Sequence, residues 1–279
     1  MATHGAARSG TSNVAENYRV KNMAKVKEIE ALGTQTIISV NELLRAFRPT
    51  VDMDATHASP FVERKRENLQ EFKIRFADTQ GRRNSAGMLI QKMYSWRGYP
   101  TGPLDPNPSR VTLVAANGDN TMATITIGFD AAGGMLVDEL YGLEVQQLRA
   151  QGERLCEFIK LAVDRSVQSK RVLASLFHIA YIFSHHIHNC TKLLIEVTPR
   201  HARFYSDMLG FEQLGPEKTN PRVQTQGVLL VLPFSLVVEK VQKFGGQPHL
   251  AAVDKKSLYP YFFSPQEEAG IAERLRMLG

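Results

Sequence analysis

The sequence is poor in the features of secreted and membrane-spanning proteins. Only two of its 279 residues are cysteine, Cys156 and Cys190, which is too few for a disulfide framework. The first ten residues, MATHGAARSG, lack the apolar core of a signal peptide. The longest apolar run, VLLVLPFSLVV at 228–238, is too short to cross a bilayer and contains Pro233. These absences predict a cytoplasmic protein without an integral membrane segment.

Acidic residues are in the minority among the charged side chains. The chain has 34 Lys and Arg against 28 Asp and Glu, which gives a formal net charge of +6. This excess favours an acidic protein, a phosphorylated ligand, an anionic membrane surface or nucleic acid as partner, or else a mildly basic solvated surface. The basic residues do not cluster with interleaved aromatic side chains, so the pattern does not favour nucleic acid.

Composition and local motifs divide the chain into four parts. We expect a disordered N-terminus at 1–20, where small and polar residues dominate, and a partly helical extension at 21–69. The helix in that extension is predicted from SVNE at 39–42, which has capping-box spacing before LLRAF. The main domain occupies 70–238, and 239–279 forms a tail in which SPQEEAGIAERLRML predicts a closing helix.

Within the main domain, strands alternate with helices. Period-two and continuous apolar patterns predict strands, and apolar residues at helical spacing predict helices. The predicted strands are 72–77, 110–116, 122–129, 154–164, 192–197 and a last one near 227–236, and the predicted helices are 81–96, 138–152 and 170–188. Asn117-Gly118 marks a hairpin between the second and third strands. A helix joins 154–164 to 192–197, so those strands should be parallel neighbours in an α/β (α+β) fold, a mixed central sheet flanked by helices.

A short helix follows in PRHARFYSDMLGFEQLG, and it is expected to end at Gly210, where glycine lets the chain turn back into the sheet. With the strand–helix–strand order before it, this segment resembles the GNAT acyltransferase superfamily, many of whose members carry a segment like A-x-x-F-Y-x-x-x-G-F late in the chain. The matching residues are Ala202, Phe204, Tyr205, Leu209, Gly210 and Phe211. The resemblance implies a GNAT-like acyltransferase fold.

Longer segments resemble one family of this superfamily, the long-chain N-acyl amino acid synthases of the FeeM type. They are RRNSAGMLIQKMYSWRGYPTG, GGMLVDELYGLEVQQLRAQG, RLCEFIKLAVD, LLIEVTPRHARFYSDMLGFEQLG and NPRVQTQGVLLVL, within roughly 70–236. These bacterial enzymes are related to the acyl-homoserine-lactone synthases. The resemblance implies transfer of a long-chain fatty acyl group from an acyl-carrier-protein thioester to the α-amine of an amino acid.

One departure from the superfamily pattern bears on the acyl donor. GNAT enzymes that use acetyl-CoA carry a Q/R-x-x-G-x-G/A loop after the central strand, and its N–H groups hold the pyrophosphate. The corresponding stretch here, DRSVQSKRVLASL, has no glycine. We therefore expect no bound cofactor, and the acyl-phosphopantetheine of acyl carrier protein as donor, with acyl-CoA as the alternative. Lys170 and Arg171 would meet the single phosphate and the acidic carrier, or else simply begin an exposed helical turn.

Aminolysis of a thioester needs a base for the amine, donors for the carbonyl oxygen and an acid for the leaving thiolate. Glu157 and Lys160 have the spacing of the E-x-x-R pair in acyl-homoserine-lactone synthases, with lysine in place of arginine. Residues three apart on a strand face opposite ways, so this pair needs a bulge. Glu157 is then the base, directly or through water, or alternatively a structural ion-pair partner. The backbone N–H groups of Leu161, Ala162 and Val163 are the expected donors to the carbonyl oxygen.

The family pattern gives Tyr205 the role of general acid, because it places the phenol near the leaving sulfur. The alternative is a core aromatic residue. Arg200 and His201 precede the same helix and are candidates to bind the acceptor carboxylate, with arginine better suited to a bidentate contact. The alternative for these two is solvation of the helix start. Cys156 adjoins Glu157 but faces the other side of the strand, so a cysteine nucleophile is disfavoured.

The acyl chain needs an apolar tunnel. Candidates lie in the helices at 81–96 and 170–188, namely Leu89, Met93, Tyr94, Trp96, Leu176 and Phe177. Most such side chains in globular proteins are simply core. The HHIH run at 185–188 lacks converging metal-ligand spacing and has no accompanying cysteine or carboxylate cluster, so we expect no metal site.

Two other functions stay open on the sequence alone. One is an acyl-homoserine-lactone-type synthase that uses S-adenosylmethionine, although only Asp105 of that family's acidic and aromatic set can be placed in 97–111. The other is a non-catalytic acyl-binding or interaction module that keeps the fold. The segments 1–69 and 239–279 either cover the acyl tunnel or form a homodimer. The residues do not specify the acceptor amino acid or the acyl length.

Overall fold

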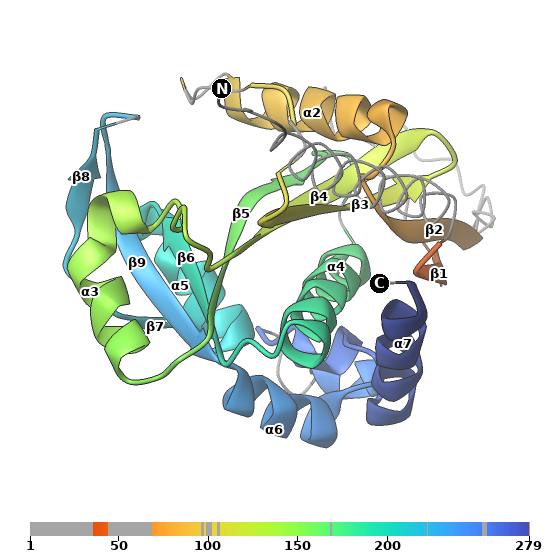
Figure 1. Ribbon diagram of the computed structural model, residues 1–279. Coiled ribbons are helices and arrows are strands. Elements are labelled where there is room, and N and C mark those ends of the chain that lie inside the picture. The colour runs from red at the N-terminus through yellow and green to blue at the C-terminus, as the bar shows by residue number, and fades with distance from the viewer. Residues whose placement is uncertain are drawn as a thin grey trace, which may run out of the picture. The chain divides into compact units, whose positions relative to one another are not determined.

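The computed structural model describes residues 36–43, 69–95, 98, 102–104, 107–167, 169–221, 223–252 and 256–278, with 41–43, 69, 70, 252 and 278 described by their backbone alone. The predictions for residues 1–35, 44–68, Trp96 and Asp105 lie outside this set. Figure 1 shows the described chain as a twisted sheet with helices on both of its faces.

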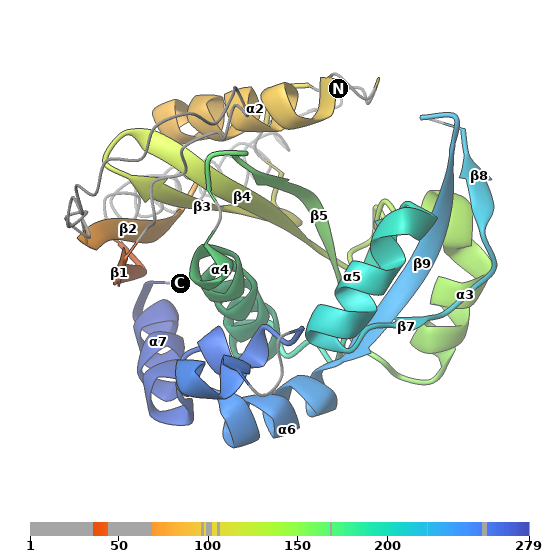
Figure 2. The same ribbon diagram turned by 180° about the vertical axis from the view of Figure 1, so that it is seen from behind.

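The described strands form one mixed, nine-stranded sheet in the order β1-β2-β3-β4-β5-β6-β9-β7, with β8 paired to β9 (Figures 1 and 2). They are β1 Ile38–Leu43, β2 Leu69–Phe76, β3 Arg110–Asn117, β4 Asn120–Phe129, β5 Leu155–Val163, β6 Lys192–Val197, β7 Glu212–Gln213, β8 Lys218–Asn220 and β9 Thr225–Pro233. Their pairings are antiparallel except that of β5 with β6, which is parallel. The predicted parallel neighbours are therefore confirmed.

The helices of the described residues follow the predicted positions closely, with one addition. They are α2 Gln80–Tyr94, α3 Asp138–Ala150, α4 Lys170–Ile182, α5 Pro199–Leu209, α6 Phe234–Phe244 and α7 Pro265–Leu278. A π-helical turn, Phe183–Ile187, continues α4, and two short 3₁₀ turns, Pro248–Ala252 and Tyr259–Tyr261, precede α7. None of the described helices has both the length and the hydrophobicity to span a membrane.

The helix predicted from the capping-box spacing at 39–42 is wrong over the residues described. The chain there is strand β1, which pairs antiparallel with β2 from Ile38↔Ile74 to Leu43↔Leu69. Ser39 does not cap a helix, because its hydroxyl hydrogen-bonds the carboxylate of Glu71 on β2. Long-range pairing therefore overrides a local capping signal.

The last predicted strand, 227–236, ends three residues early, and helix α6 follows it. Proline has no backbone N–H to donate to a ladder, so Pro233 ends β9, and its φ of −66° suits the position before a helix. Phe234, Val237 and Val241 then bury one helical face. The apolar run at 228–238 thus belongs to two elements, and its continuous hydrophobicity concealed the boundary.

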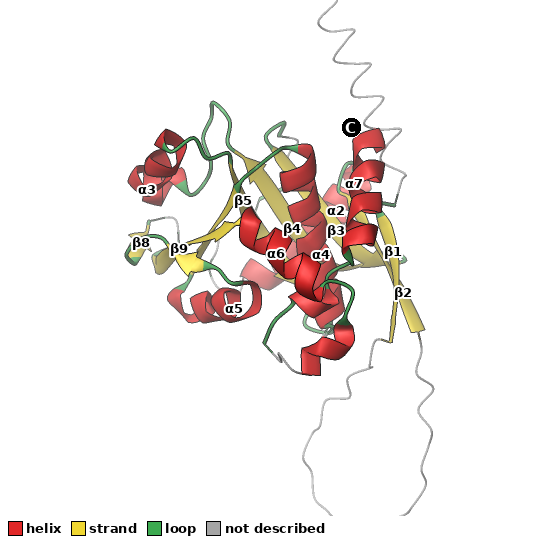
Figure 3. Cartoon of the chain, turned by 90° about the horizontal axis from the view of Figure 1, so that it is seen from below, coloured by secondary structure: helices red, strands yellow, loops and turns green. Residues whose placement is uncertain are grey.

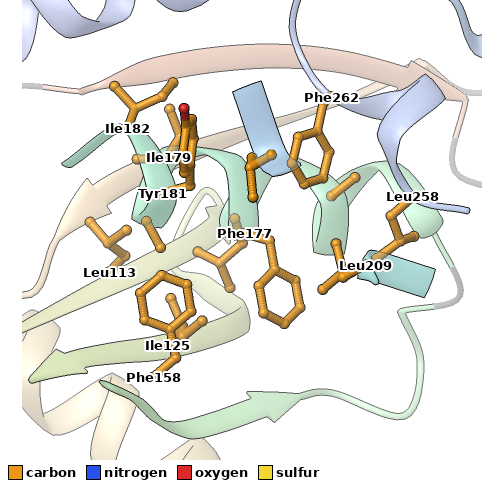
Figure 4. Packing of buried hydrophobic residues seen from close by; sticks show 14 of the residues in the cluster. Leu113, Ile125, Phe158, Phe177, Ile179, Tyr181, Ile182, Leu209, Leu258 and Phe262 are labelled. Carbon is orange, nitrogen blue, oxygen red and sulfur yellow. The ribbon is translucent and has the colours of Figure 1, made fainter. Parts of the chain in front are cut away.

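Side-chain alternation divides the sheet into an α4 face and an α3 face. On the α4 face, Phe158, Leu193 and Ile195 join a large buried cluster with Phe177 and, further along, with α6 and α7 (Figures 3 and 4). On the α3 face, Leu155, Leu194 and Leu229 pack against Tyr141, Val145 and Leu148 of α3. Helix α2 covers the same face further along, where Leu89 and Ile90 contact Ala162.

Two irregularities of β5 position the site. The strand pairs with β6 only from Leu155↔Lys192 to Glu157↔Leu194, so the two strands part beyond that point. Opposite β4, the register steps from Thr126↔Ile159 to Thr124↔Ala162, which leaves one extra residue on β5. Lys160 in this bulge has a φ of +52°, a conformation that costs a non-glycine residue roughly 1–2 kcal/mol. The bulge required for an E-x-x-K pair is therefore present.

Candidate active site

A cavity of about 620 Å³ lies where β5 and β6 part. Its wall is apolar near α2, α4 and α5 and polar near β8 and β9. The apolar and aromatic part includes Ile90, Met93, Tyr94, Phe158, Leu161, Val163, Leu173, Phe177, Phe204 and Tyr205, and the polar part includes Lys160, Glu196, Thr198, His201, Asn220, Thr225 and Gln226. This is the shape and lining expected for a ligand that is part lipid and part amino acid.

The cavity is lined from both faces of the sheet. Phe177 and Tyr205 approach from the α4 face, where they pack in the large cluster. Val137, just before α3, belongs to the cluster on the α3 face, and Glu196 faces the same way because Leu194, two residues earlier on β6, packs in that cluster. Since the sheet is not closed between β5 and β6 at this level, groups from the two faces can meet there.

Tyr205 lies on the cavity wall, presented by the short helix α5. Its ring makes edge contacts with Phe177, at 6.4 Å between centroids, and with Phe211, at 5.7 Å. Burial, with a smaller contribution from the nearby Tyr94, raises the pKa of the Tyr205 phenol well above its ordinary value. The phenol therefore carries its proton at neutral pH. The helix ends as expected at Gly210, whose φ is +82°.

The β5 bulge is held from α2. The Tyr94 hydroxyl donates a hydrogen bond of 2.7 Å to the carbonyl oxygen of Leu161. Leu161 follows Lys160, the residue with positive φ, and both side chains line the cavity. Tyr94, predicted only as tunnel wall, thus also fixes the backbone at the bulge.

Glu157, the predicted base, is fully buried, and its carboxylate holds a neighbouring loop. One oxygen accepts the N–H of Leu136 at 2.9 Å and the other accepts the N–H of Val137 at 3.1 Å. Burial raises the pKa of this carboxyl, although the two N–H bonds and Arg110 oppose the rise. Leu136 and Val137 form the cavity wall here, and the carboxylate lies behind them. Lys160, by contrast, is on the wall itself.

Glu196 was missed by the sequence analysis. It is half-buried on β6, lines the cavity and accepts a hydrogen bond from the side-chain amide of Asn220 on β8. A side chain on Gly227 of β9 would place its Cβ 2.9 Å from the Glu196 Oε1 atom. The available signal was a charged residue within an otherwise apolar strand, KLLIEV, but that signal alone does not separate a site residue from an edge residue.

The other predicted residues divide between the cavity wall and positions away from it. On the wall are Met93, Tyr94, Lys160, Leu161, Val163, Phe177, His201 and Tyr205. Away from it are Leu89 and Ala162, which pack together under α2, Leu176, which is core, and Arg200, which is exposed. Leu89 and Leu176 are thus core residues rather than tunnel wall. The His201 Nδ1 atom hydrogen-bonds the Thr198 hydroxyl at 2.8 Å.

Lys170 and Arg171 lie at the N-terminus of α4, the helix that follows β5. The Ser169 hydroxyl caps this helix by accepting the N–H groups of Arg171 at 3.1 Å and Val172 at 3.2 Å. Lys170 is exposed and Arg171 is half-buried. Both positions agree with the start of an exposed helical turn.

The histidine run and the cysteines have structural contacts. The His185 Nδ1 atom bonds the Cys190 carbonyl oxygen at 2.8 Å, and the His186 Nε2 atom bonds Glu268 of α7 at 2.7 Å. Within the described residues, no group of three or more histidine, cysteine or carboxylate side chains could hold a metal ion. Cys156 is buried on the α4 face, opposite Glu157, and burial raises the pKa of its thiol.

A mixed sheet that opens between two parallel strands, above a helix that begins just beyond the first of them, defines a GNAT-type acyltransferase fold. The chain is an acyltransferase, and it belongs to the N-acyl amino acid synthase FeeM family, whose model matches residues 85–233. The structure of FeeM, an N-acyl amino acid synthase from uncultured soil microbes, is similar, with a TM-score of 0.54 and 26% identity over 60% of this chain and 93% of that chain.

More distant similarities include an acyl-CoA N-acyltransferase from Pseudomonas aeruginosa, with a TM-score of 0.43 and 10% identity over 58% of this chain and 98% of that one. A CoA-dependent acyl-homoserine lactone synthase, BjaI, with S-adenosylmethionine and isopentyl-CoA, has a TM-score of 0.41 and 11% identity over 57% of this chain and 78% of that one. No curated protein sequence matches the chain.

Proposed function

We propose that this protein transfers a long-chain fatty acyl group from the phosphopantetheine thioester of acyl carrier protein to the α-amine of an amino acid. One observation carries the proposal. A single cavity joins an apolar part under α2 and α4 to a polar part at β8 and β9, and both Lys160 of the β5 bulge and Tyr205 line it. An acyl chain fits the first part and an amino acid fits the second.

Two features support acyl carrier protein as the donor: the positive net charge of the chain and the lack of glycine between β5 and α4. The segment between β5 and α4 contains no glycine, so it lacks the backbone cradle that would hold a pyrophosphate. A phosphopantetheine arm brings one phosphate, for which Lys170 and Arg171 at the start of α4 suffice. The net charge of +6 favours an acidic carrier over a neutral partner. Acyl-CoA is the alternative donor.

The thioester carbonyl would be polarised by backbone N–H groups of β5 at 161–163. Beyond Glu157 this strand no longer pairs with β6, so one edge of its backbone faces the cavity. Tyr94 holds that edge through its bond to the Leu161 carbonyl. Donors fixed in this way need no rearrangement when charge develops on the carbonyl oxygen, which is the condition for strong stabilisation.

Tyr205 would protonate the leaving thiolate. The residue is half-buried at the wall, and its raised pKa keeps the proton in place until the sulfur becomes basic. Lys160 and His201 line the same wall and are the candidates to bind the carboxylate of the acceptor. Glu157 stays a predicted base that would act through water, since Leu136 and Val137 lie between it and the cavity.

The test is release of carrier thiol by purified protein supplied with acyl carrier protein charged with acyl chains of increasing length, and a mixture of amino acids. We expect thiol release that depends on an amino acid, with the N-acyl amino acid detected by mass. Acyl-CoA and S-adenosylmethionine are run in parallel. Binding of the charged carrier without thiol release indicates a non-catalytic module, and consumption of S-adenosylmethionine indicates a lactone synthase. Turnover with acyl-CoA alone contradicts the carrier-protein donor.

A further inference from the structure

One acidic side chain, Glu196, lines the cavity among the described residues. It lies on β6 just beyond the point where β5 and β6 part. Asn220, Thr225 and Gln226 add amide and hydroxyl groups to the same polar wall, which Lys160 and His201 also line. A carboxylate on the polar wall of a cavity can bind a cationic ligand group through a charge-assisted hydrogen bond.

The position of this carboxylate is built into two neighbouring strands. Asn220 of β8 is buried, and its side-chain amide donates a hydrogen bond to the Glu196 Oε1 atom. Gly227 of β9 provides the space, because a Cβ there would come within 2.9 Å of Oε1 and 3.3 Å of Cγ. Asn220 therefore orients the Glu196 carboxylate, and the lack of a side chain at Gly227 leaves room for it.

Glu196 and Tyr205 reach the cavity from opposite faces of the sheet. Leu194 packs against α3, and Glu196, two residues further along β6, faces the same way. Tyr205 contacts Phe177 in the cluster on the α4 face. An acyl thioester that enters along α4 and an amine that enters from the α3 face would meet between them.

We propose that Glu196 holds the ammonium group of the acceptor amino acid and takes its first proton, an assignment that rests on the N-acyl transfer proposed above. The nitrogen sheds two protons as the ammonium becomes an amide. The first passes to the Glu196 carboxylate and then to solvent, which frees the nitrogen lone pair to form the C–N bond with the thioester carbon. As the C–S bond breaks, Tyr205 gives its phenolic proton to the sulfur and is reprotonated by the second proton from nitrogen.

Glu157 is the competing carboxylate for the first proton. Both of its oxygens accept backbone N–H groups, at 2.9 and 3.1 Å, from Leu136 and Val137. A proton reaches it only through a water or by displacement of that loop, whereas Glu196 is itself on the wall. The geometry therefore favours Glu196 in direct contact with the ammonium group.

The experiment measures thiol release against pH for the wild type, Glu196→Gln, Glu157→Gln and the control Glu212→Gln, which lies exposed on β7. We expect Glu196→Gln to lower kcat/KM for the amino acid by about 10²–10⁴-fold, the usual contribution of a general base. Its residual rate should rise about tenfold per pH unit up to the pKa of the free amine, because only deprotonated acceptor then reacts. With hydroxylamine, a weakly basic acceptor, the Glu196→Gln substitution should lower kcat/KM much less.

Two results overturn the assignment. One is a Glu196→Gln enzyme with a rate and pH profile like those of the Glu212→Gln control. The other is the same loss and pH dependence appearing in Glu157→Gln and not in Glu196→Gln. Gly227→Ala supplies a second variant that keeps the carboxylate but displaces it, and we expect it to lower kcat/KM in the same direction while the protein stays folded. An unchanged rate in Gly227→Ala also counts against the proposal.

A binding measurement separates this assignment from the proposed function. Hexylammonium has the charge and an apolar tail but is not an amino acid, and its binding is followed calorimetrically in the absence of donor. We expect the wild type to bind it and Glu196→Gln to bind at least tenfold more weakly, roughly the value of a charge-assisted contact. Equal binding overturns the ammonium site. Failure of the proposed function would appear in a different assay, in which the wild-type protein would release no thiol with any amino acid.

Discussion

Tyr205 is half-buried, with its ring packed against the α4-face cluster and its side chain on the cavity wall. Replacing it with phenylalanine should preserve the edge contacts to Phe177 and Phe211 and remove the proton donor alone. We expect Tyr205→Phe to lower kcat by about 10²–10³-fold, within the range of general acid catalysis. The free energy of unfolding should change by less than about 1 kcal/mol, since packing is kept.

The matched control is Tyr181→Phe. Tyr181 is a buried tyrosine on α4, outside the cavity wall, and its hydroxyl has no hydrogen-bond partner among the described residues. Thiol-release kinetics and urea unfolding are measured on both variants. Equal activity of the two would remove the acid role from Tyr205.

Glu157 leads to a prediction about stability as well as activity. A glutamine there keeps one acceptor oxygen but turns its NH₂ group toward a backbone N–H of Leu136 or Val137. The unpaired donor should lower the free energy of unfolding by about 1–3 kcal/mol. Urea unfolding of Glu157→Gln checks this, and an unchanged midpoint would mean that the loop at 136–137 does not depend on the carboxylate.

Sequence reasoning reached some site residues and missed others for physical reasons. Tyr205 stands in a recognisable local segment, and its place on the cavity wall follows from that segment. Glu196 depends on contacts with Asn220 and Gly227, which are 24 and 31 positions away, so no local pattern marks it. The helical spacing of Leu176 is compatible with a tunnel wall and with the core, and only its packing in the structure shows that it belongs to the core.

At the scale of secondary-structure elements, the predictable features were those set by local periodicity. Helices α2, α3 and α4 and strands β3 to β6 show clear apolar periods in sequence, and all of them form. Strand β1 was mistaken for a helix because its partner, β2, lies some 30 residues further along the chain. Helix α6 was hidden in a continuous apolar run, where one proline decides the boundary.

Helix α7 is joined to α4 through a buried histidine, which gives a prediction for pH. The Nδ1 atom of His178 accepts the Phe263 N–H at 2.9 Å, and its Nε2–H donates to Glu268 at 2.9 Å, so the ring is neutral. Burial lowers the pKa of His178 below its ordinary 6.5, against the opposing charge of Glu268. The unfolded chain therefore takes up a proton below pH 6.5 that the folded chain does not.

Stability should be fully present above pH 6.5 and fall as the pH drops below it, by at most about 1.4 kcal/mol per pH unit for this one group. Burial alone would raise the pKa of Glu268, but its bonds from His178 and His186 outweigh this and lower it to about 2, so it adds a loss of the same sign below its ordinary 4.5. Urea unfolding between pH 8 and 5 measures the first slope. The dependence of the unfolding free energy on pH should be weaker in His178→Gln than in the wild type. The same dependence in both proteins would contradict the assignment to His178.

At the scale of the whole molecule, docking of an acidic carrier is tested by charge reversal at the start of α4. Lys170→Glu should raise the KM for acyl carrier protein by about tenfold at low salt, and the effect should shrink as salt screens the contact. A small acyl-pantetheine donor should show no such change. Lys243→Glu on α6 is the control charge reversal. Equal effects of the two variants would indicate only a general loss of positive charge.

The central claim, that this acyltransferase makes N-acyl amino acids, is tested most directly by mass spectrometry of lipids from a bacterial host that expresses it. Wild type is compared with Tyr205→Phe, both confirmed as folded and equally abundant. The account predicts new long-chain N-acyl amino acids in the wild-type extract and their near absence in the variant, with the masses giving acceptor and chain length. No acylated amino acid from the wild type, in a host supplied with every common amino acid, would contradict it.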